Sequence, residues 1–309
     1  MTSQQNCVWV AGEVLIDLIR QGSESKAIVG GGPANTAVAL SRLGINTCFI
    51  DGISTDDYGI QAKKVLIDAG VNLGFAEYSD KPTCIADVTL DQSGSATYEF
   101  LIDGTATFDF NGDWLPNPTE NSPTVLYLGT LAAIVEPGAT ALFQWAREVS
   151  KFAPIIYDPN VRTSILSDRS RYQKSVAKWV SISKVVKVSS DDLEWLYPGE
   201  TFDAVAARWL NAGVELAVLT RGPDGLRAIT NFGEISVPGM PIIVVDTVGA
   251  GDTVGAILVE AVTEQGLESL RGDELVRVLN RAARAAAITC SRPGANPPSK
   301  LELDQSIVS

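Results

Sequence analysis

Short apolar runs alternate with helical patterns along most of this chain, and this alternation narrows the accessible folds more than any other feature. The runs are apolar at nearly every position, which is typical of strands buried on both faces. We therefore predict an α/β fold, a Rossmann-like, mostly parallel sheet with helices on both faces. The predicted strands are residues 8–11, 47–50, 125–128, 154–157, 185–188 and 216–220, and the predicted helices between the later strands are 139–151, 171–179 and 203–212.

The alternation breaks between residues 84 and 110. Apolar residues there are interrupted by the polar turn sequence DQSG at residues 91–94, which is typical of a β-hairpin. We predict a small β flap outside the main sheet. The chain shows no internal repeat and no low-complexity linker, so residues 1–309 are expected to form a single domain. The polar, proline-rich stretch from residue 294 onward is expected to be a surface tail.

Charge and composition exclude several classes of protein. The formal net charge of −13 disfavours attraction to nucleic acid or to an anionic membrane surface. No apolar run is long enough to span a bilayer, and the first residues lack the pattern of a secretory signal. The four cysteines are scattered, without a Cys-x-x-Cys pair, so we expect a cytoplasmic chain with buried thiols.

The chain contains no histidine. This excludes Ser-His-Asp and Cys-His catalysis and any zinc site that needs imidazole ligands. Chemistry in this protein must therefore use carboxylates, lysine and arginine, backbone amides and hard cations.

The segment DTVGAGDT, from Asp246 to Thr253, is the strongest candidate for a functional turn. We predict a strand before it, at residues 241–245, and a helix after it, so its small residues lie at a helix N-terminus that can bind an anion. It is neither a P-loop, which needs Lys-Ser or Lys-Thr, nor a dinucleotide fingerprint. An anion does not call for the carboxylate of Asp252, which makes better sense as a base beside a phosphoryl group. A purely structural glycine turn is the alternative.

Polar residues follow most of the predicted strands. In a parallel sheet the carboxyl ends of the strands share one edge, where the active site is expected. Any single cluster could be an ordinary loop, but their common position favours a site. The clusters are Asp17, Glu136, residues 158–160, 189–192, 220–225 and 246–252.

Two segments resemble the motifs of the ribokinase-like (PfkB-type) sugar kinases, and the likeness extends over nearly the whole chain. GGGPANTAVALSRLG, residues 30–44, resembles the N-terminal glycine-rich motif, and DTVGAGD, residues 246–252, resembles the C-terminal signature. The fructokinase branch is the most similar. The resemblance implies an ATP-dependent kinase for a sugar hydroxyl, with a small β lid over the active site. Phosphoryl transfer mainly needs positioning and charge stabilisation, which suits such a turn.

The resemblance also implies roles for individual residues. Asp252 would be the catalytic base, and the amides of Gly249, Ala250 and Gly251 would form the anion hole. The sugar would be bound by Asp17, Gly31, Gly32, Asn35, Glu136 and Arg162, although Arg162 could equally be a solvated surface residue. ATP would be bound by Ser189, Thr220, Gly222, Gly225 and Gly251.

The metal sites implied by the resemblance are less regular. The family often has Asn-x-x-Glu for magnesium, whereas this chain has Ser189-Ser190-Asp191-Asp192, so Asp192 would hold Mg²⁺ through water, with Glu194 as a substitute. A K⁺ site would use Asp246 and carbonyls of Val248, Thr289 and Gly294. The alternative for Asp246 is a salt bridge or a helix cap.

The implied lid comprises residues of about 14–27 and 84–110, and a homodimer through the lid is a further expectation. Fructose is the leading substrate. Ribose, 2-keto-3-deoxygluconate or a nucleoside are alternative acceptors, and a catalytically silent sugar-sensing relative is the alternative from another class.

Overall fold

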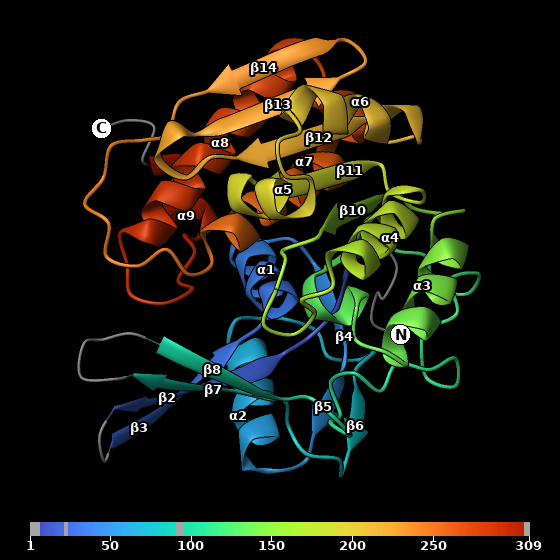
Figure 1. Ribbon diagram of the computed structural model, residues 1–309, viewed down its shortest axis with the longest axis vertical. Coiled ribbons are helices and arrows are strands. Elements are labelled where there is room, and N and C mark those ends of the chain that lie inside the picture. The colour runs from blue at the N-terminus through green and yellow to red at the C-terminus, as the bar shows by residue number, and fades with distance from the viewer. Residues whose placement is uncertain (1–6, 22–23, 91–95, 306–309) are drawn as a thin grey trace.

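The computed structural model describes residues 7–21, 24–90 and 96–305. Its main sheet is parallel from β12 to β4, and the antiparallel strands β13 and β14 extend it beyond β12 (Figure 1). This confirms the predicted Rossmann-like fold. In sheet order the strands are β14 (Gly233–Val237), β13 (Leu226–Thr230), β12 (Leu216–Thr220), β11 (Val185–Ser189), β10 (Ile155–Asp158), β9 (Leu126–Gly129), β1 (Val8–Ala11) and β4 (Thr47–Ile50).

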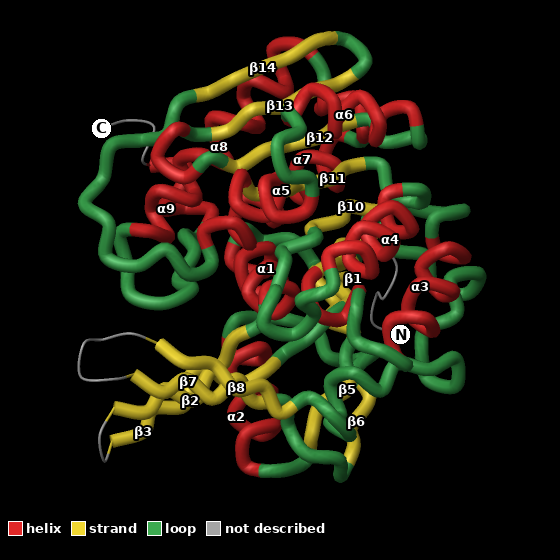
Figure 2. The backbone as a smooth tube through the Cα atoms, in the orientation of Figure 1, coloured by secondary structure: helices red, strands yellow, loops and turns green. Residues whose placement is uncertain are grey.

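Helices cover both faces of this sheet, as Figure 2 shows. Strands such as β1 and β9 are buried at every position because each face packs against its own apolar layer. One layer is built with α3 (Gly138–Val149), α4 (Arg169–Val180), α5 (Ser190–Leu196) and α6 (Phe202–Asn211). The other is built with α1 (Gly32–Arg42), α2 (Asp57–Asp68), α7 (Ala250–Gln265) and α8 (Gly272–Cys290).

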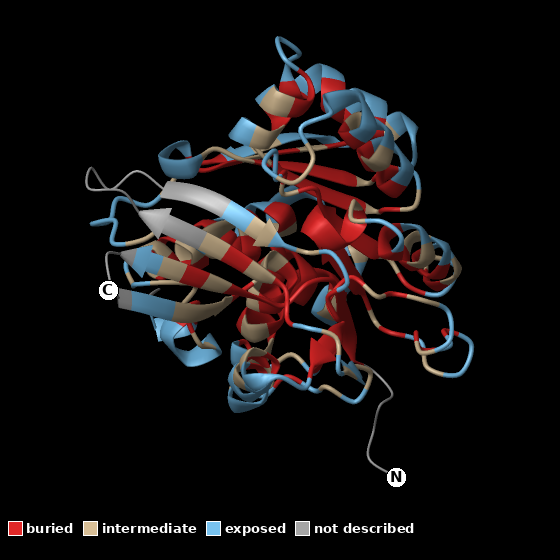
Figure 3. Ribbon diagram, turned by 60° about the horizontal axis from the view of Figure 1, so that its bottom comes forward, coloured by how far each residue is buried: buried red, intermediate tan, exposed pale blue. Residues whose placement is uncertain are grey.

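A second, smaller sheet lies outside this body, and we refer to it as the lid. Its order is β3-β2-β7-β8, so it joins two segments that are far apart in the sequence. Burial is concentrated in the main sheet and its helices, whereas the described residues at the outer end of the lid are more exposed (Figure 3). Residues 22–23 and 91–95 of the expected lid segments lie outside the described part of the chain. The lid strands are β2 (Leu15–Gln21), β3 (Glu24–Gly30), β7 (Ile85–Leu90) and β8 (Ala96–Leu101).

The predicted strand at residues 241–245 is wrong. This segment is irregular and leads from β14 to α7, and Ile243 is 88% exposed. Its last amide, that of Val245, donates to the carbonyl of Cys290 at the end of α8. β-Branched residues favour strands only where a pleated, half-buried surface receives them, and this segment has no such partner among the described strands.

Several smaller elements were not predicted. The hairpin of β13 and β14 and the short pair of β5 (Gly52–Ser54) with β6 (Glu77–Ser79) are additions. The stretch from residue 294 is not simply a tail, because it contains α9 (Lys300–Gln305), whose Leu303 is fully buried in the layer of α7 and α8. Short 3-10 helices occupy Thr130–Ala133, Gly222–Asp224 and Leu267–Leu270.

The thiols agree with the expectation from composition. None of the four cysteines forms a disulfide with the described residues, and three of them are buried: Cys7, Cys48 and Cys84. Among the residues that the structure describes, no helix is both long and apolar enough to cross a membrane.

Candidate active site

The glycine turn before α7 has a shape that only glycine allows at its first position. Gly249 is the N-cap of α7 and has a left-handed backbone, with φ of +79°. A Cβ on Gly249 would lie 2.7 Å from the Cβ of Ala295. The amide of Gly251 has no acceptor within the helix and is available to an anion, whereas the amide of Ala250 donates to the carbonyl of Thr247 at 3.3 Å.

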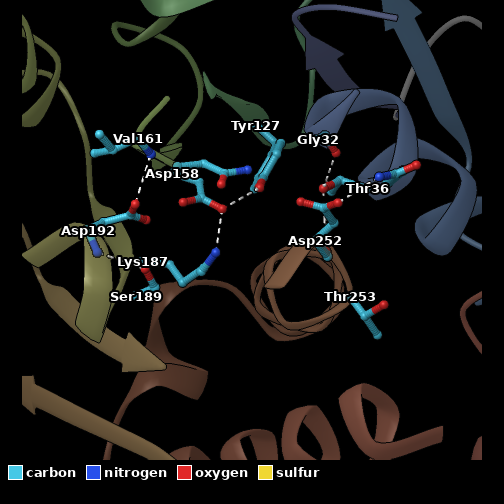
Figure 4. A network of polar contacts seen from close by, with 12 residues as sticks. Gly32, Thr36, Tyr127, Asp158, Val161, Lys187, Ser189, Asp192, Asp252 and Thr253 are labelled. Carbon is cyan, nitrogen blue, oxygen red and sulfur yellow. Dashed lines mark hydrogen bonds and ion pairs between the residues drawn. The ribbon is translucent and has the colours of Figure 1, made fainter. Parts of the chain in front are cut away.

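Asp252 lies in the first turn of α7, with its side chain directed toward α1 (Figure 4). It is only 7% exposed, and its Oδ2 accepts a 2.8 Å hydrogen bond from Nδ2 of Asn35. A Cβ on Gly32 would lie 3.3 Å from Oδ1 of the same carboxylate. The two glycine-rich motifs, more than 200 residues apart in the chain, therefore meet at Asp252.

Burial raises the pKa of Asp252 to about 6. The hydrogen bond from Asn35 and the positive charge of Lys187 act in the opposite direction. The negative charge of Asp158 raises the pKa further, and Arg162 lowers it. A carboxylate with this pKa is a much better proton acceptor near neutral pH than an ordinary surface aspartate.

This pKa predicts an acid limb in the pH profile of catalysis. Asp252 must be ionised to accept a proton, so kcat/KM should fall about tenfold for each pH unit below about pH 6. Steady-state assays between pH 4.5 and 8.5 measure it, with ADP affinity over the same range as the control. Undiminished kcat/KM at pH 4.5 in folded enzyme would contradict the role of Asp252 as base.

Asp17 and Gly31, which are expected to hold the sugar, lie on β2 of the lid and directly after β3. Asp17, on β2 of the lid, is so close to β3 that a Cβ on Gly30 would lie 2.3 Å from its Oδ2. Gly31 has a φ of +108°, and a Cβ there would lie 2.4 Å from the carbonyl oxygen of Glu13. Burial raises the pKa of Asp17, and the charge of Arg162 lowers it. The backbone at this junction between lid and main sheet is therefore tightly packed.

The loop after β10 faces the same region. Asn160 has a left-handed backbone, with φ of +37°, and its Nδ2 would lie 3.0 Å from a Cβ on Gly32. Nη1 of Arg162 donates to the Oδ1 of Asn160 at 2.7 Å. Arg162 is exposed, yet its charge affects the pKa of Asp17, Asp252 and Asp192. It therefore lies near the site without a carboxylate of its own among the described ion pairs.

The residues expected to hold ATP occupy the next strand ends. Ser189 pairs with Thr220 across β11 and β12. The Oγ of Ser189 accepts a hydrogen bond from the amide of Asp192, as an N-cap of α5. Gly222 and Gly225 both have positive φ, and a Cβ on Gly225 would lie 2.2 Å from the carbonyl oxygen of Val237. Packing against the end of β14 already requires glycine at position 225.

Asp246 binds two segments of backbone together. Its Oδ1 accepts a hydrogen bond from the amide of Val248 at 3.0 Å, and its Oδ2 accepts one from the amide of Gly294 at 2.8 Å. These bonds hold its pKa below the usual range. Thr289 lies deeper, with its hydroxyl 3.0 Å from that of Thr253. The structure thus brings Asp246, Val248 and Gly294 together, but Asp246 does not cap α7, whose N-cap is Gly249.

Glu136 does not join this group. Its carboxylate accepts hydrogen bonds from the amide and the hydroxyl of Thr140, at 3.1 and 2.8 Å, and so caps α3. It borders a cavity of about 280 Å³ against α4. A larger cavity of about 640 Å³ lies between the end of β8 and residues 164–166. Asp17 and Asp252 line neither of these cavities.

Lys187 is a residue at the site that the sequence analysis missed. Its Nζ lies 2.5 Å from the Oδ2 of Asp158, and both side chains are almost fully buried. The signal was a lysine in the middle of the otherwise apolar run of β11. A charge inside a buried strand needs a partner, so a lysine within an apolar run indicates a buried polar site, as a polar strand end does.

The comparisons with known proteins decide the family. Residues 7–301 match the sequence pattern of the family described as "pfkB family carbohydrate kinase". The chain belongs to the PfkB family of carbohydrate kinases. It is therefore an ATP-dependent sugar kinase, as the two glycine-rich motifs indicated.

One relative agrees with this assignment, and two solved structures share the fold. The fructokinase of Rhizobium leguminosarum bv. trifolii is 36% identical over 251 residues, which cover 79% of this chain and 76% of the relative. The crystal structure of a fructokinase with bound ATP from Xylella fastidiosa has a TM-score of 0.87 at 24% identity, covering 98% and 99% of the two chains. The aminoimidazole riboside kinase from Salmonella enterica, complexed with aminoimidazole riboside and an ATP analogue, has a TM-score of 0.84 at 23% identity, covering 98% and 100%.

Proposed function

We propose that this PfkB kinase phosphorylates fructose. The observation that carries the proposal is the meeting of the two glycine-rich motifs at the buried Asp252, whose carboxylate accepts a hydrogen bond from Asn35 of the first motif. The 36% identity to a fructokinase supports fructose over other sugars. The fold alone would suit other acceptors as well, since a riboside kinase shares it.

In the proposed mechanism, Asp252 orients a sugar hydroxyl and accepts its proton. The amides of Gly249, Ala250 and Gly251 bind the transferring phosphoryl group at the N-terminus of α7. Asn35, which donates to Asp252, and Asp17 of the lid bind the hydroxyls of the sugar. Ser189, Thr220 and Gly222 lie toward the nucleotide.

Magnesium fits the carboxylates on the nucleotide side. Oδ1 of Asp192 accepts a hydrogen bond from the amide of Val161 at 3.1 Å, and the described residues provide no such bond to its other oxygen. Asp158 also has one buried oxygen without a partner among the described residues. Carboxylate oxygens are suited to magnesium and its bound water. Asp192 would hold Mg²⁺ through water, and the bound ion would neutralise phosphate charge.

A monovalent cation would have to share oxygens that are already used. Both carboxylate oxygens of Asp246 accept amide hydrogen bonds, so the carbonyls of Val248, Thr289 and Gly294 would have to supply most of the ligands. K⁺ is therefore proposed as an activator that reinforces the contact between Asp246 and Gly294.

We also propose a cytoplasmic enzyme. A homodimer would form through the lid, whose outermost strands are β3 and β8.

The function is tested by ADP release from MgATP with fructose, ribose, 2-keto-3-deoxygluconate, glucose and adenosine, with and without K⁺. We expect kcat/KM for fructose to exceed that for each other acceptor by about 100-fold, a difference of roughly 3 kcal/mol in transition-state binding. Glucose is the matched control, being a hexose of the same size. A preference for another acceptor would refute fructose but not the kinase. Binding of ATP without turnover of any acceptor would favour the silent relative.

A further inference from the structure

Lys187 occupies an unusual place for a cation. It lies in β11, between Val186 and Val188, and its side chain is only 4% exposed. No other lysine or arginine in the described part of the chain is buried to this degree. A buried ammonium is costly unless something compensates it, so its surroundings should show why it is there.

Two groups surround the ammonium. On one side, Nζ lies 2.5 Å from Oδ2 of Asp158, which also accepts a hydrogen bond from the hydroxyl of Tyr127 at 3.3 Å (Figure 4). On the other side, a Cβ on Gly251 would lie 3.0 Å from Nζ. The ammonium therefore lies between a buried carboxylate and the backbone of the glycine turn before α7.

Stability alone does not account for this pair. Removing two charges from water usually costs about as much as their attraction returns, and an apolar pair of the same volume is often equally stable. On the side away from Asp158, however, the ammonium faces the glycine turn where the phosphoryl group would bind. The carboxylates of Asp158, Asp192 and Asp252 also lie close enough to act on this ammonium, and they would repel the phosphates of ATP.

We propose that Lys187 is a catalytic residue whose ammonium binds the transferring phosphoryl group at the Gly249–Gly251 turn, while Asp158 holds the ammonium in place. The proposal rests on phosphoryl transfer at this turn. In the step, the sugar oxygen forms a bond to the γ-phosphorus, the bond from that phosphorus to the β-γ bridging oxygen breaks, and the hydroxyl proton passes to Asp252. Lys187 keeps its proton throughout and offsets the negative charge on the phosphoryl oxygens.

The charge state of Lys187 agrees with this role. Burial lowers the pKa of the ammonium, but the charge of Asp158 and the hydrogen bond to it raise it more, so the net shift is upward. Lys187 is therefore a cation at neutral pH, where Asp252 is ionised. Its positive charge also lowers the pKa of Asp252, which gives a second measurable effect.

The test begins with Lys187→Met, which keeps the length of the side chain and removes the charge. We expect kcat to fall about 100-fold, the typical effect of deleting one charge-stabilising donor, with KM for the sugar within about threefold. The acid limb of kcat/KM should move to higher pH, because Asp252 loses a neighbouring cation. Lys184→Met is the matched control, since Lys184 directly precedes β11 and its side chain is 45% exposed in an ion pair with Glu215.

A double variant separates catalysis from structure. Lys187→Met alone leaves Asp158 buried without its partner, so the protein could lose stability for that reason. Lys187→Met with Asp158→Asn removes both charges and should recover Tm while kcat stays low. Recovery of kcat together with Tm, or no change of kcat in folded Lys187→Met, would overturn the proposal.

A binding measurement tests the role of Lys187 without depending on which sugar is the acceptor. MgADP with aluminium fluoride mimics the transferring phosphoryl group, and its affinity can be measured with no sugar present. Lys187→Met should weaken it about 100-fold relative to MgADP alone. An unchanged ratio would overturn the role of Lys187, whereas failure of the acceptor panel alone would concern only the sugar.

Discussion

Asp252→Asn is expected to lower kcat by about 10³-fold, within the range that general acid–base catalysis contributes. Asparagine has the same shape, and its Oδ1 can still accept the hydrogen bond from Asn35. It cannot take a proton from the hydroxyl. The KM for the sugar should remain within about threefold of the wild-type value, because the lost interaction is made in the transition state.

The control for this substitution is Asp273→Asn. Asp273 also lies in the first turn of a helix, α8, but it is exposed. It therefore reports what is lost when an acidic residue is removed from a helix N-terminus without touching the site. We expect wild-type kcat for Asp273→Asn and a similar Tm for both variants. If Asp252→Asn kept more than about a tenth of wild-type kcat, proton transfer to Asp252 would be excluded as an important step.

The parallel core could be predicted from the sequence because each of its strands carries a local signal. β1 is buried at all four of its positions, so its run is apolar throughout. β14 is intermediate or exposed at most of its positions, and its residues follow no such rule. Whether an exposed edge segment forms a strand depends on the strand beside it more than on its own residues. The same physics explains the wrong strand at residues 241–245, where an apolar run lies on the surface.

The sequence predicts at which edge of the sheet the site lies, but it does not predict which side chains are in contact there. The strand-end rule places Asp17, Glu136 and Asp252 at the same edge, but it contains no distances. The bond between Asn35 and Asp252 depends on how α1 and α7 pack. Glu136 obeys the rule, yet it caps α3 because the amide and hydroxyl of Thr140 are closer. Roles for these residues in catalysis and binding stay predictions.

Gly249→Ala should lower kcat about 100-fold by displacing the anion hole. Alanine in a left-handed backbone costs about 1–2 kcal/mol, and its Cβ would lie 2.7 Å from that of Ala295. The turn must therefore move, and with it the amides of Ala250 and Gly251. A shift of about 1 Å in catalytic groups can cost about 100-fold in rate. Steady-state kinetics and the affinity for MgADP with aluminium fluoride both report the displacement.

Gly44→Ala is the control that separates the backbone cost of alanine from the displacement of the turn. Gly44 follows α1 with a φ of +82°, nearly that of Gly249, but a Cβ there would meet nothing within 4 Å. Both variants therefore have a similar backbone cost, and only one moves the turn. We expect a comparable loss of stability, with normal kcat in Gly44→Ala. Equal kcat in the two variants would mean that the turn tolerates a Cβ, and the anion hole would then have to lie elsewhere than at the amides before Asp252.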